Sequence, residues 1–139
     1  MHFLWLVVIL VLVVWATGCG QDGEEAMQDR SAPAAGEEMR FPKIVEANAN
    51  RTGDRSYDFS VTISSPYDSP DRYANGWRVL TPDGDVLGEH ELAHDHANEQ
   101  PFTREQTGVE VPSGVDEVLV EPRDLTNGYG GKRVPVRLP

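Results

Sequence analysis

The sequence predicts an all-β protein, a single antiparallel β-sandwich of about seven strands that follows an apolar N-terminal segment and an acidic tether. Two observations predict this fold. After Phe41, short runs rich in β-branched and aromatic residues recur about every ten residues, separated by clusters of Gly, Pro, Asn and Asp. Within one run, Tyr57, Phe59, Val61 and Ile63 alternate with polar residues, which places an apolar row on one face of a strand.

Length and composition limit what the chain can be. Its 139 residues leave room for one domain of roughly 100 residues after the N-terminal segments. A single cysteine, Cys19, excludes an intramolecular disulfide, so apolar packing and backbone pairing must stabilise the domain. The net charge of −11 lies entirely after residue 18. Such an acidic chain argues against nucleic acid as a partner and against lying flat on anionic lipid.

Residues 1–18 are predicted to be a signal peptide with a helical, apolar centre. Residues 3–16 read FLWLVVILVLVVWA, which is short of the about 20 helical residues that span a bilayer core. Small residues, Thr17 and Gly18, then precede Cys19, as a signal peptidase requires. An ordinary secretory signal, an uncleaved anchor and a buried core helix are the alternatives.

The stretch Ala16-Thr17-Gly18-Cys19 resembles the lipobox of bacterial lipoproteins. That resemblance implies that the thiol of Cys19 receives a diacylglyceryl group and that Cys19 becomes the new N-terminus. It implies attachment to the membrane through the lipid and a place in the cell envelope. Gly20, where an Asp would retain such a protein in the inner membrane, implies an outer membrane location facing the periplasm in a Gram-negative host.

Residues 19–40 are predicted to be the lipidated cysteine and a disordered, acidic tether. The segment has no apolar periodicity to bury, and its length corresponds to roughly 25 Å root-mean-square. A solvating spacer is the simpler interpretation, and a docking segment for a basic partner is the alternative. Two arginines, Arg30 and Arg40, stand against six acids: Asp22, Glu24, Glu25, Asp29, Glu37 and Glu38.

Residues 41–139 are predicted to form the β-sandwich. Thr81 to Asp85 reads TPDGD and predicts a hairpin turn, and Asn127 to Gly131 predicts a turn between the last two strands. Pro135 makes the last strand an edge strand or a broken one. Trp77, Val79, Val118 and Val120 are expected in the buried row, with Phe102 as a core residue. The predicted strands are Lys43–Ala49, Tyr57–Ser64, Gly76–Thr81, Val86–Leu92, Phe102–Val111, Glu117–Pro122 and Arg133–Leu138.

Trp77 in the third predicted strand and the stretch VPSGVDEVLV at residues 111–120 resemble the immunoglobulin and fibronectin type III sandwiches. The resemblance implies an immunoglobulin-like arrangement of strands. The paired cysteines of true immunoglobulin domains are absent. Such a fold does not by itself indicate a function.

Three histidines, His90, His94 and His96, gather in one window and are the only ones outside the signal segment. Imidazole is the commonest protein ligand of zinc and copper, so the window is a candidate metal site. A strand would place His94 and His96 about 7 Å apart on one face and His90 about 13 Å further away. A three-histidine site therefore requires a bend after Leu92. A solvent-exposed loop and a pH-responsive contact are the alternatives.

Tyr129, flanked by glycines, is a candidate contact for a glycan or a partner chain, unless its ring folds back on the sheet. Nothing resembles a nucleophile elbow or a phosphate loop. The sequence therefore predicts a non-enzymatic envelope lipoprotein, without a cofactor, whose sandwich is a binding or structural module with an unknown ligand. The alternative is a periplasmic lipoprotein that binds zinc or copper through the histidines.

Overall fold

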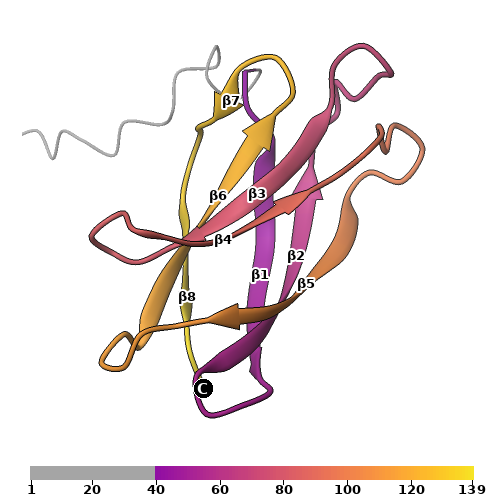
Figure 1. Ribbon diagram of the computed structural model, residues 1–139. Coiled ribbons are helices and arrows are strands. Elements are labelled where there is room, and N and C mark those ends of the chain that lie inside the picture. Colours follow the sequence, from indigo (N-terminus) through magenta and orange to yellow (C-terminus); the bar gives the residue numbers. More distant parts are fainter. Residues whose placement is uncertain (1–39) are drawn as a thin grey trace, which may run out of the picture. The chain divides into compact units, whose positions relative to one another are not determined.

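Two antiparallel β-sheets pack face to face in the computed structural model, which describes residues 40–139 (Figure 1). The predictions for the signal peptide, for Cys19 and for most of the tether lie outside the described residues. Within residues 40–139 the secondary structure is entirely strand, turn and loop, and no helix there could cross a membrane. The prediction of an all-β sandwich is confirmed.

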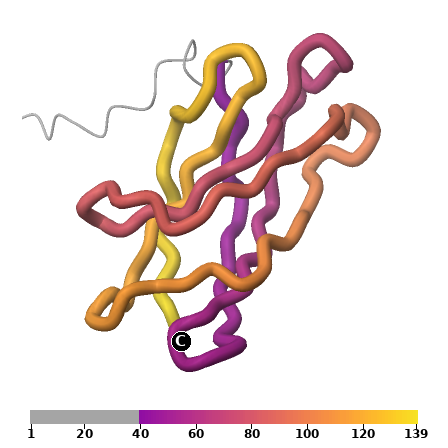
Figure 2. The backbone as a smooth tube through the Cα atoms, in the orientation of Figure 1, coloured from indigo at the N-terminus to yellow at the C-terminus, as the bar shows by residue number. Residues whose placement is uncertain are grey.

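The first sheet has three strands in the order β1-β2-β5. The second has five: β4, β3 and β6 lie side by side, and β7 and β8 both pair with the far edge of β6. Figure 2 shows the chain passing from one sheet to the other after β2, after β4 and after β5. The bounds are β1 Lys43–Arg51, β2 Ser56–Ser64, β3 Ala74–Leu80, β4 Val86–Glu91, β5 Phe102–Glu110, β6 Glu117–Asp124, β7 Gly128–Tyr129 and β8 Val134–Arg137.

The alternation predicted for β2 is present. Tyr57, Phe59, Val61 and Ile63 are buried, whereas the residues between them are partly exposed. Burying such side chains contributes about 1.5–3 kcal/mol each, which explains why this strand fixes one wall of the core. The residues expected from the other strands join the same core cluster: Trp77, Val79, Phe102, Val118 and Val120.

The turn chemistry is partly as predicted. β3 and β4 pair through the TPDGD turn, in which Thr81 N–H donates to the carbonyl of Asp85. Pro135 lies in β8, which pairs only with β6 among residues 40–139 and is therefore an edge strand. The expected turn at residues 127–131 is different, because Gly128 already belongs to β7. The tight turn comes earlier, since the Asp124 carboxylate accepts the N–H groups of residues 126 and 127.

Gly76 allows β3 and β4 to approach each other closely. Its φ is +148°, a conformation that residues with a side chain rarely adopt, and a Cβ there would lie 2.0 Å from the carbonyl oxygen of His90. A side chain could relieve such a clash by changing its rotamer, but a backbone oxygen cannot. Gly84, with φ +97°, lies in the exposed turn with nothing within 4 Å of such a Cβ.

We expect Gly76→Ala to lower the free energy of unfolding by about 3 kcal/mol or more, because backbone strain and a steric clash add. Gly84→Ala carries only the strain, and its cost should be about 1 kcal/mol. Urea denaturation followed by tryptophan fluorescence measures both. Equal losses in the two variants would show that the close approach of β3 to β4 is not a constraint on folding.

Candidate functional site

The structure separates His90 from the other two histidines. His90 lies on β4, opposite Trp77 of β3 in the register, and the two rings stack with centroids 4.1 Å apart. Burial lowers the pKa of the half-buried His90 below its usual 6.5. This histidine therefore packs against the largest side chain of the core.

His94 and His96 come together in the loop between β4 and β5. Their ring centroids are 4.7 Å apart, and the His96 ring stacks on Phe102 at 4.0 Å. His94 is exposed and its Nδ1 lies 2.8 Å from the carbonyl oxygen of Asp95, whereas His96 is only 5% exposed. Among the described residues, no three His, Cys, Asp or Glu side chains form a group that could hold a metal. The three-histidine site stays a prediction.

A buried carboxylate, Asp68, explains why His96 is buried. Asp68 Oδ1 accepts hydrogen bonds from the Ser65 hydroxyl (2.5 Å) and the Ala74 N–H (3.0 Å), and Oδ2 accepts the His96 N–H (2.9 Å). The Gln100 side chain donates to the His96 carbonyl and accepts the Ser65 N–H. The β2–β3 and β4–β5 loops are thus tied together. Sequence reasoning missed Asp68 and Gln100 because neither belongs to a periodic run.

The surroundings of His96 disfavour a charge on its ring. Its buried Nδ1 has no hydrogen bond partner in the described structure. Burial lowers the His96 pKa most, the Arg104 guanidinium and the neighbouring His94 ring lower it further, and the carboxylates of Glu99 and Asp68 oppose the shift. A proton on this ring would place a charge against Phe102 without a partner.

A second buried carboxylate, Asp124, organises the neighbouring loops. Its Oδ1 accepts the N–H of Asn127 (2.8 Å) and Oδ2 accepts Arg72 Nε (3.1 Å). Burial acts to raise the Asp124 pKa, but the hydrogen bonds from Asn127 and Arg72 and the nearby hydroxyl of Tyr67 outweigh it, and the pKa is lowered. Asn127 Nδ2 also donates to the Arg40 carbonyl, which fixes the first described residue to this end of the domain.

Tyr67 lies beneath Arg72, whose guanidinium carbon is 4.1 Å from the ring centroid. Burial and the negative charge of Asp124 raise the pKa of the Tyr67 hydroxyl strongly. The hydroxyl is buried and approaches Asp124, but it makes no hydrogen bond of regular geometry in the described structure. Tyr67 therefore stays protonated and acts as a packing group.

The ring of Tyr129 lies against the sheet, which is one of the two alternatives that the sequence left open. The guanidinium carbons of Arg78 and Arg123 are 4.2 Å and 5.3 Å from its ring centroid. Burial and the nearby carboxylate of Glu89 raise the pKa of the Tyr129 hydroxyl. Its half-buried ring lies beside Arg78 of β3 and Arg123 of β6. A role as a contact residue stays a prediction.

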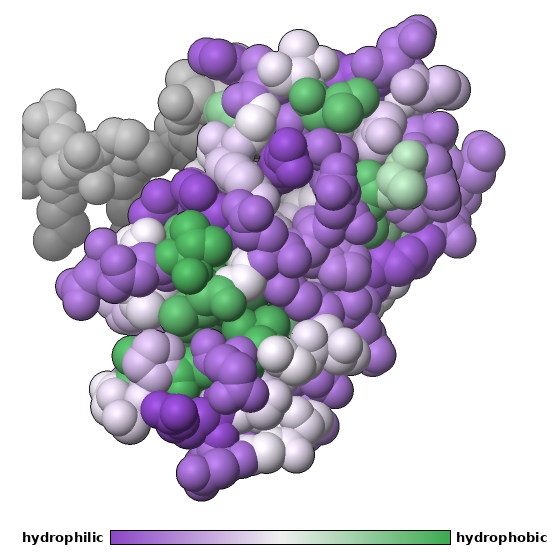
Figure 3. Space-filling model, viewed as in Figure 1, coloured by the Kyte–Doolittle hydropathy of each residue, from purple (hydrophilic) through white to green (hydrophobic). Residues whose placement is uncertain are grey.

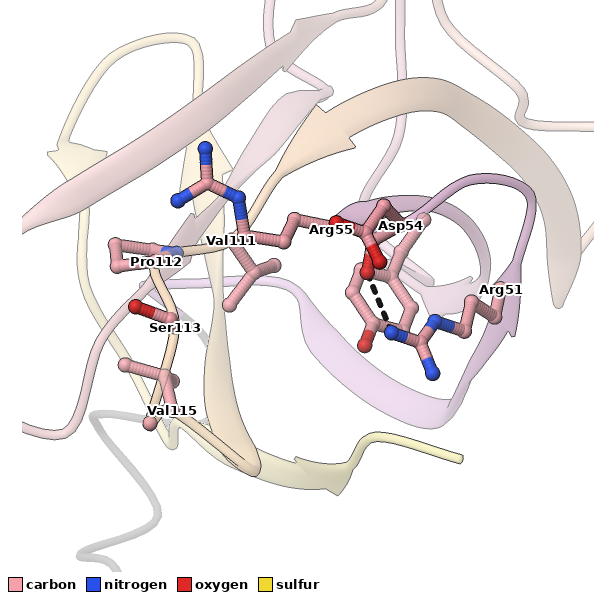
Figure 4. A pocket seen from close by; sticks show the side chains of 9 residues that line it. Arg51, Asp54, Arg55, Val111, Pro112, Ser113 and Val115 are labelled. Carbon is pink, nitrogen blue, oxygen red and sulfur yellow. Dashed lines mark hydrogen bonds between the residues drawn. The ribbon is translucent and has the colours of Figure 1, made fainter.

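A cavity of about 370 Å³ lies between the β1–β2 turn and the β5–β6 loop. Figure 4 shows Arg51 turned toward Asp54, whose carbonyl accepts its hydrogen bond, while the Arg55 side chain runs past Val111. The Arg51 guanidinium carbon lies 6.0 Å from the ring centroid of Tyr57. The cavity therefore places cationic groups beside apolar ones. No sequence pattern indicated it, because its walls come from two separate turns.

No protein family model and no solved structure matches the chain. It is similar to a protein of Halomicrobium mukohataei that is named "Putative lipoprotein", with 38% identity over 116 residues. The match covers 84% of this chain and 57% of the relative, so the chain spans little more than half of that protein's length.

We expect the domain to lose stability as the pH falls through about 6.5, the ordinary histidine pKa. The pKa values of His96 and His90 are lowered in the folded state, so the unfolded chain binds these protons more readily. The pKa of Asp124 is also lowered in the folded state, so the contribution of Asp124 to stability is lost only at lower pH, below its usual pKa of 3.8.

Urea denaturation at about pH 7.5 and 5.5 checks this expectation. His96→Phe keeps the backbone N–H that Asp68 accepts and removes the titrating ring, so the variant should lose part of the pH dependence. A wild-type stability that does not change between these pH values would contradict the buried, uncharged state of His96.

Proposed function

We propose that this chain is a lipid-anchored envelope lipoprotein whose β-sandwich is a non-enzymatic binding or structural module. One observation carries the proposal: the chain is 38% identical over 116 residues to a protein named "Putative lipoprotein". Cys19, the sole cysteine, follows an apolar run and two small residues, where lipoproteins carry their acyl chains. Two or three acyl chains, at about 0.8 kcal/mol for each buried methylene, give lasting attachment.

The extent of the match supports this proposal. The match covers 84% of the 139 residues, about 116, whereas residues 40–139 number 100, so at least 16 matched residues precede Arg40. The similarity therefore includes part of the predicted tether. Segments that only connect an anchor to a domain usually vary more in sequence than a packed core. A match that reaches into the predicted tether therefore favours the same arrangement of tether and domain in both proteins.

The buried carboxylates of the described residues favour a binding or structural role for the domain over a catalytic one. Two of the buried carboxylates, Asp68 and Asp124, each accept several hydrogen bonds that hold loops in place. A catalytic acid or base needs a position from which its proton can reach a substrate. These two carboxylates therefore stabilise the fold. The outer membrane location that Gly20 implies stays a prediction.

We also infer an immunoglobulin-like arrangement for the sandwich. Strands β1, β2 and β5 share one sheet and β3, β6 and β8 share the other, as strands A, B, E and C, F, G do in immunoglobulin domains. β4 extends the second sheet beside β3, as an extra strand does in variable-type domains. Trp77 on β3 supplies the buried tryptophan of strand C.

Replacing Cys19→Ser tests the anchor. We expect the wild-type protein in the membrane fraction of its native cells, with an N-terminal peptide whose mass includes a diacylglyceryl group. The variant should lose this mass and should leave the membrane fraction or keep its uncleaved signal. Wild-type protein with an intact Met1 and an unmodified thiol would contradict the proposal.

The contact between His94 and His96 favours a second candidate function, binding of zinc or copper(II). If the Nδ1–H of His94 donates to the Asp95 carbonyl, its Nε2 lone pair is free to bind a metal. Two ring centroids 4.7 Å apart suit two neighbouring ligands of one ion, with water completing the coordination.

Titration calorimetry of the full chain in detergent tests this candidate. We expect a dissociation constant below about 1 mM for zinc or copper(II). His94→Ala with His96→Ala should abolish the heat, whereas His90→Gln should retain it because His90 packs on Trp77. A dissociation constant above about 1 mM, or the same binding in the double variant, would contradict metal binding by these histidines.

A further inference from the structure

One asparagine of the chain lies in the pattern that N-linked glycosylation requires. The pattern is an asparagine followed two positions later by serine or threonine, with any residue except proline between them. The stretch Asn50-Arg51-Thr52 has this pattern. At the other asparagines the residue two positions later is Asn, Trp, Gln or Tyr, so the chain offers a single acceptor of this kind. These other asparagines are Asn48, Asn75, Asn98 and Asn127.

The structure leaves the side-chain amide of Asn50 accessible. Asn50 is exposed near the end of β1. Ala47 and Ala49 pack against the core, so alternation along the strand turns Asn48 and Asn50 toward the outer face of the three-stranded sheet. Asn48 Nδ2 donates to Glu46 at 2.8 Å, whereas the Asn50 amide makes no hydrogen bond within residues 40–139. The nitrogen that would carry a sugar is therefore free.

The hydroxyl of Thr52, the second required group, is also accessible. Thr52 is exposed, and its Oγ1 donates to the carbonyl of Ser56 at 3.2 Å. The same carbonyl accepts the backbone N–H groups of Thr52 (2.9 Å) and Gly53 (3.2 Å). The hydroxyl can therefore turn toward an enzyme while the Ser56 carbonyl keeps two donors and the β1–β2 turn stays closed.

Asn50 lies at the end of the sandwich opposite the point where the chain enters it. Arg40 is tied to Asn127 at one end, and β1 then runs about 25–30 Å from Lys43 to Arg51. Figure 1 shows the β1–β2 turn at the far end of β1, and the surface at this end is hydrophilic or neutral in Figure 3. A glycan at this end would cover no apolar surface that a partner could need.

A hollow of about 160 Å³ adjoins Asn50 and is lined largely by polar residues. In the register, Asp58 lies opposite Asn50 and Ser60 lies opposite Asn48. Amide, hydroxyl and carboxylate groups are the hydrogen bond partners that sugar hydroxyls can use. The first sugar of a glycan on Asn50 therefore has both space and polar partners beside the strand. The polar lining residues are Asn48, Asn50, Asp58, Ser60 and Glu105.

We propose that Asn50 is the acceptor of an N-linked glycan, transferred outside the cytoplasm from a donor sugar that carries a phosphate leaving group on C1. The Asn50 amide nitrogen attacks C1, and a bond between nitrogen and C1 forms. The bond between C1 and the phosphate oxygen breaks, and the phosphate leaves with the electron pair. The nitrogen gives one proton to a base of the transferring enzyme. The inference rests on the proposed function, because export would bring the chain to this enzyme.

Mass spectrometry of the full chain from its native cells tests the acceptor. Trypsin, which cleaves after Lys43 and Arg51, releases residues 44–51 with both Asn48 and Asn50. We expect a form of this peptide whose mass is increased by one or more sugar residues. Fragmentation should place the sugar on Asn50 and none on Asn48. A peptide without sugar, or with its sugar on Asn48, would overturn the proposal.

Variants at Thr52 give a matched pair that leaves the sequence of this peptide unchanged. Thr52→Ala removes the required hydroxyl, so the sugar-bearing form should be lost. Thr52→Ser keeps a hydroxyl, so the sugar-bearing form should be retained. Asn50→Gln should also abolish the modification, and Asn48→Gln should not. Sugar that persists on Asn50 in the Thr52→Ala variant would show that the pattern is not recognised and would overturn the proposal.

The same digest separates this inference from the proposed anchor. A lipid-modified Cys19 peptide together with bare residues 44–51 would overturn the glycan alone. Sugar on Asn50 together with an unmodified Cys19 would overturn the anchor alone. If both peptides are unmodified, both proposals are wrong.

Discussion

The hydrogen bond from the Trp77 indole to the Gln106 side chain joins the two sheets through the middle of the core. Trp77 comes from β3 and Gln106 from β5, the nitrogen and oxygen are 2.8 Å apart, and Trp77 is fully buried. An indole N–H in a dry core needs an acceptor, so one polar side chain has to be buried with it. Gly88 makes this possible, because a Cβ there would lie 2.8 Å from Gln106 Nε2. His90 covers the ring from β4.

The loops at one end of the sandwich depend on two further buried polar groups. Asp68 joins the β2–β3 and β4–β5 loops, and Asp124 holds the β6–β7 turn and Arg72. Both carboxylates accept several hydrogen bonds, which offsets the cost of removing a charge from water. Because Arg40 is tied to Asn127, the chain enters the domain at a fixed point.

The sequence by itself determined the fold class, the core strands and one hairpin. The alternation from Tyr57 to Ile63 and the turn at Thr81 to Asp85 are local signals that tertiary packing did not override. Only the tertiary structure decided which polar residues are buried and which histidines meet. Asp68, Gln106 and Asp124 act on residues 28 to 52 positions away in the chain, and such contacts leave no periodic trace in a sequence. The pairing of His94 with His96 likewise depends on a loop that the distant Asp68 holds.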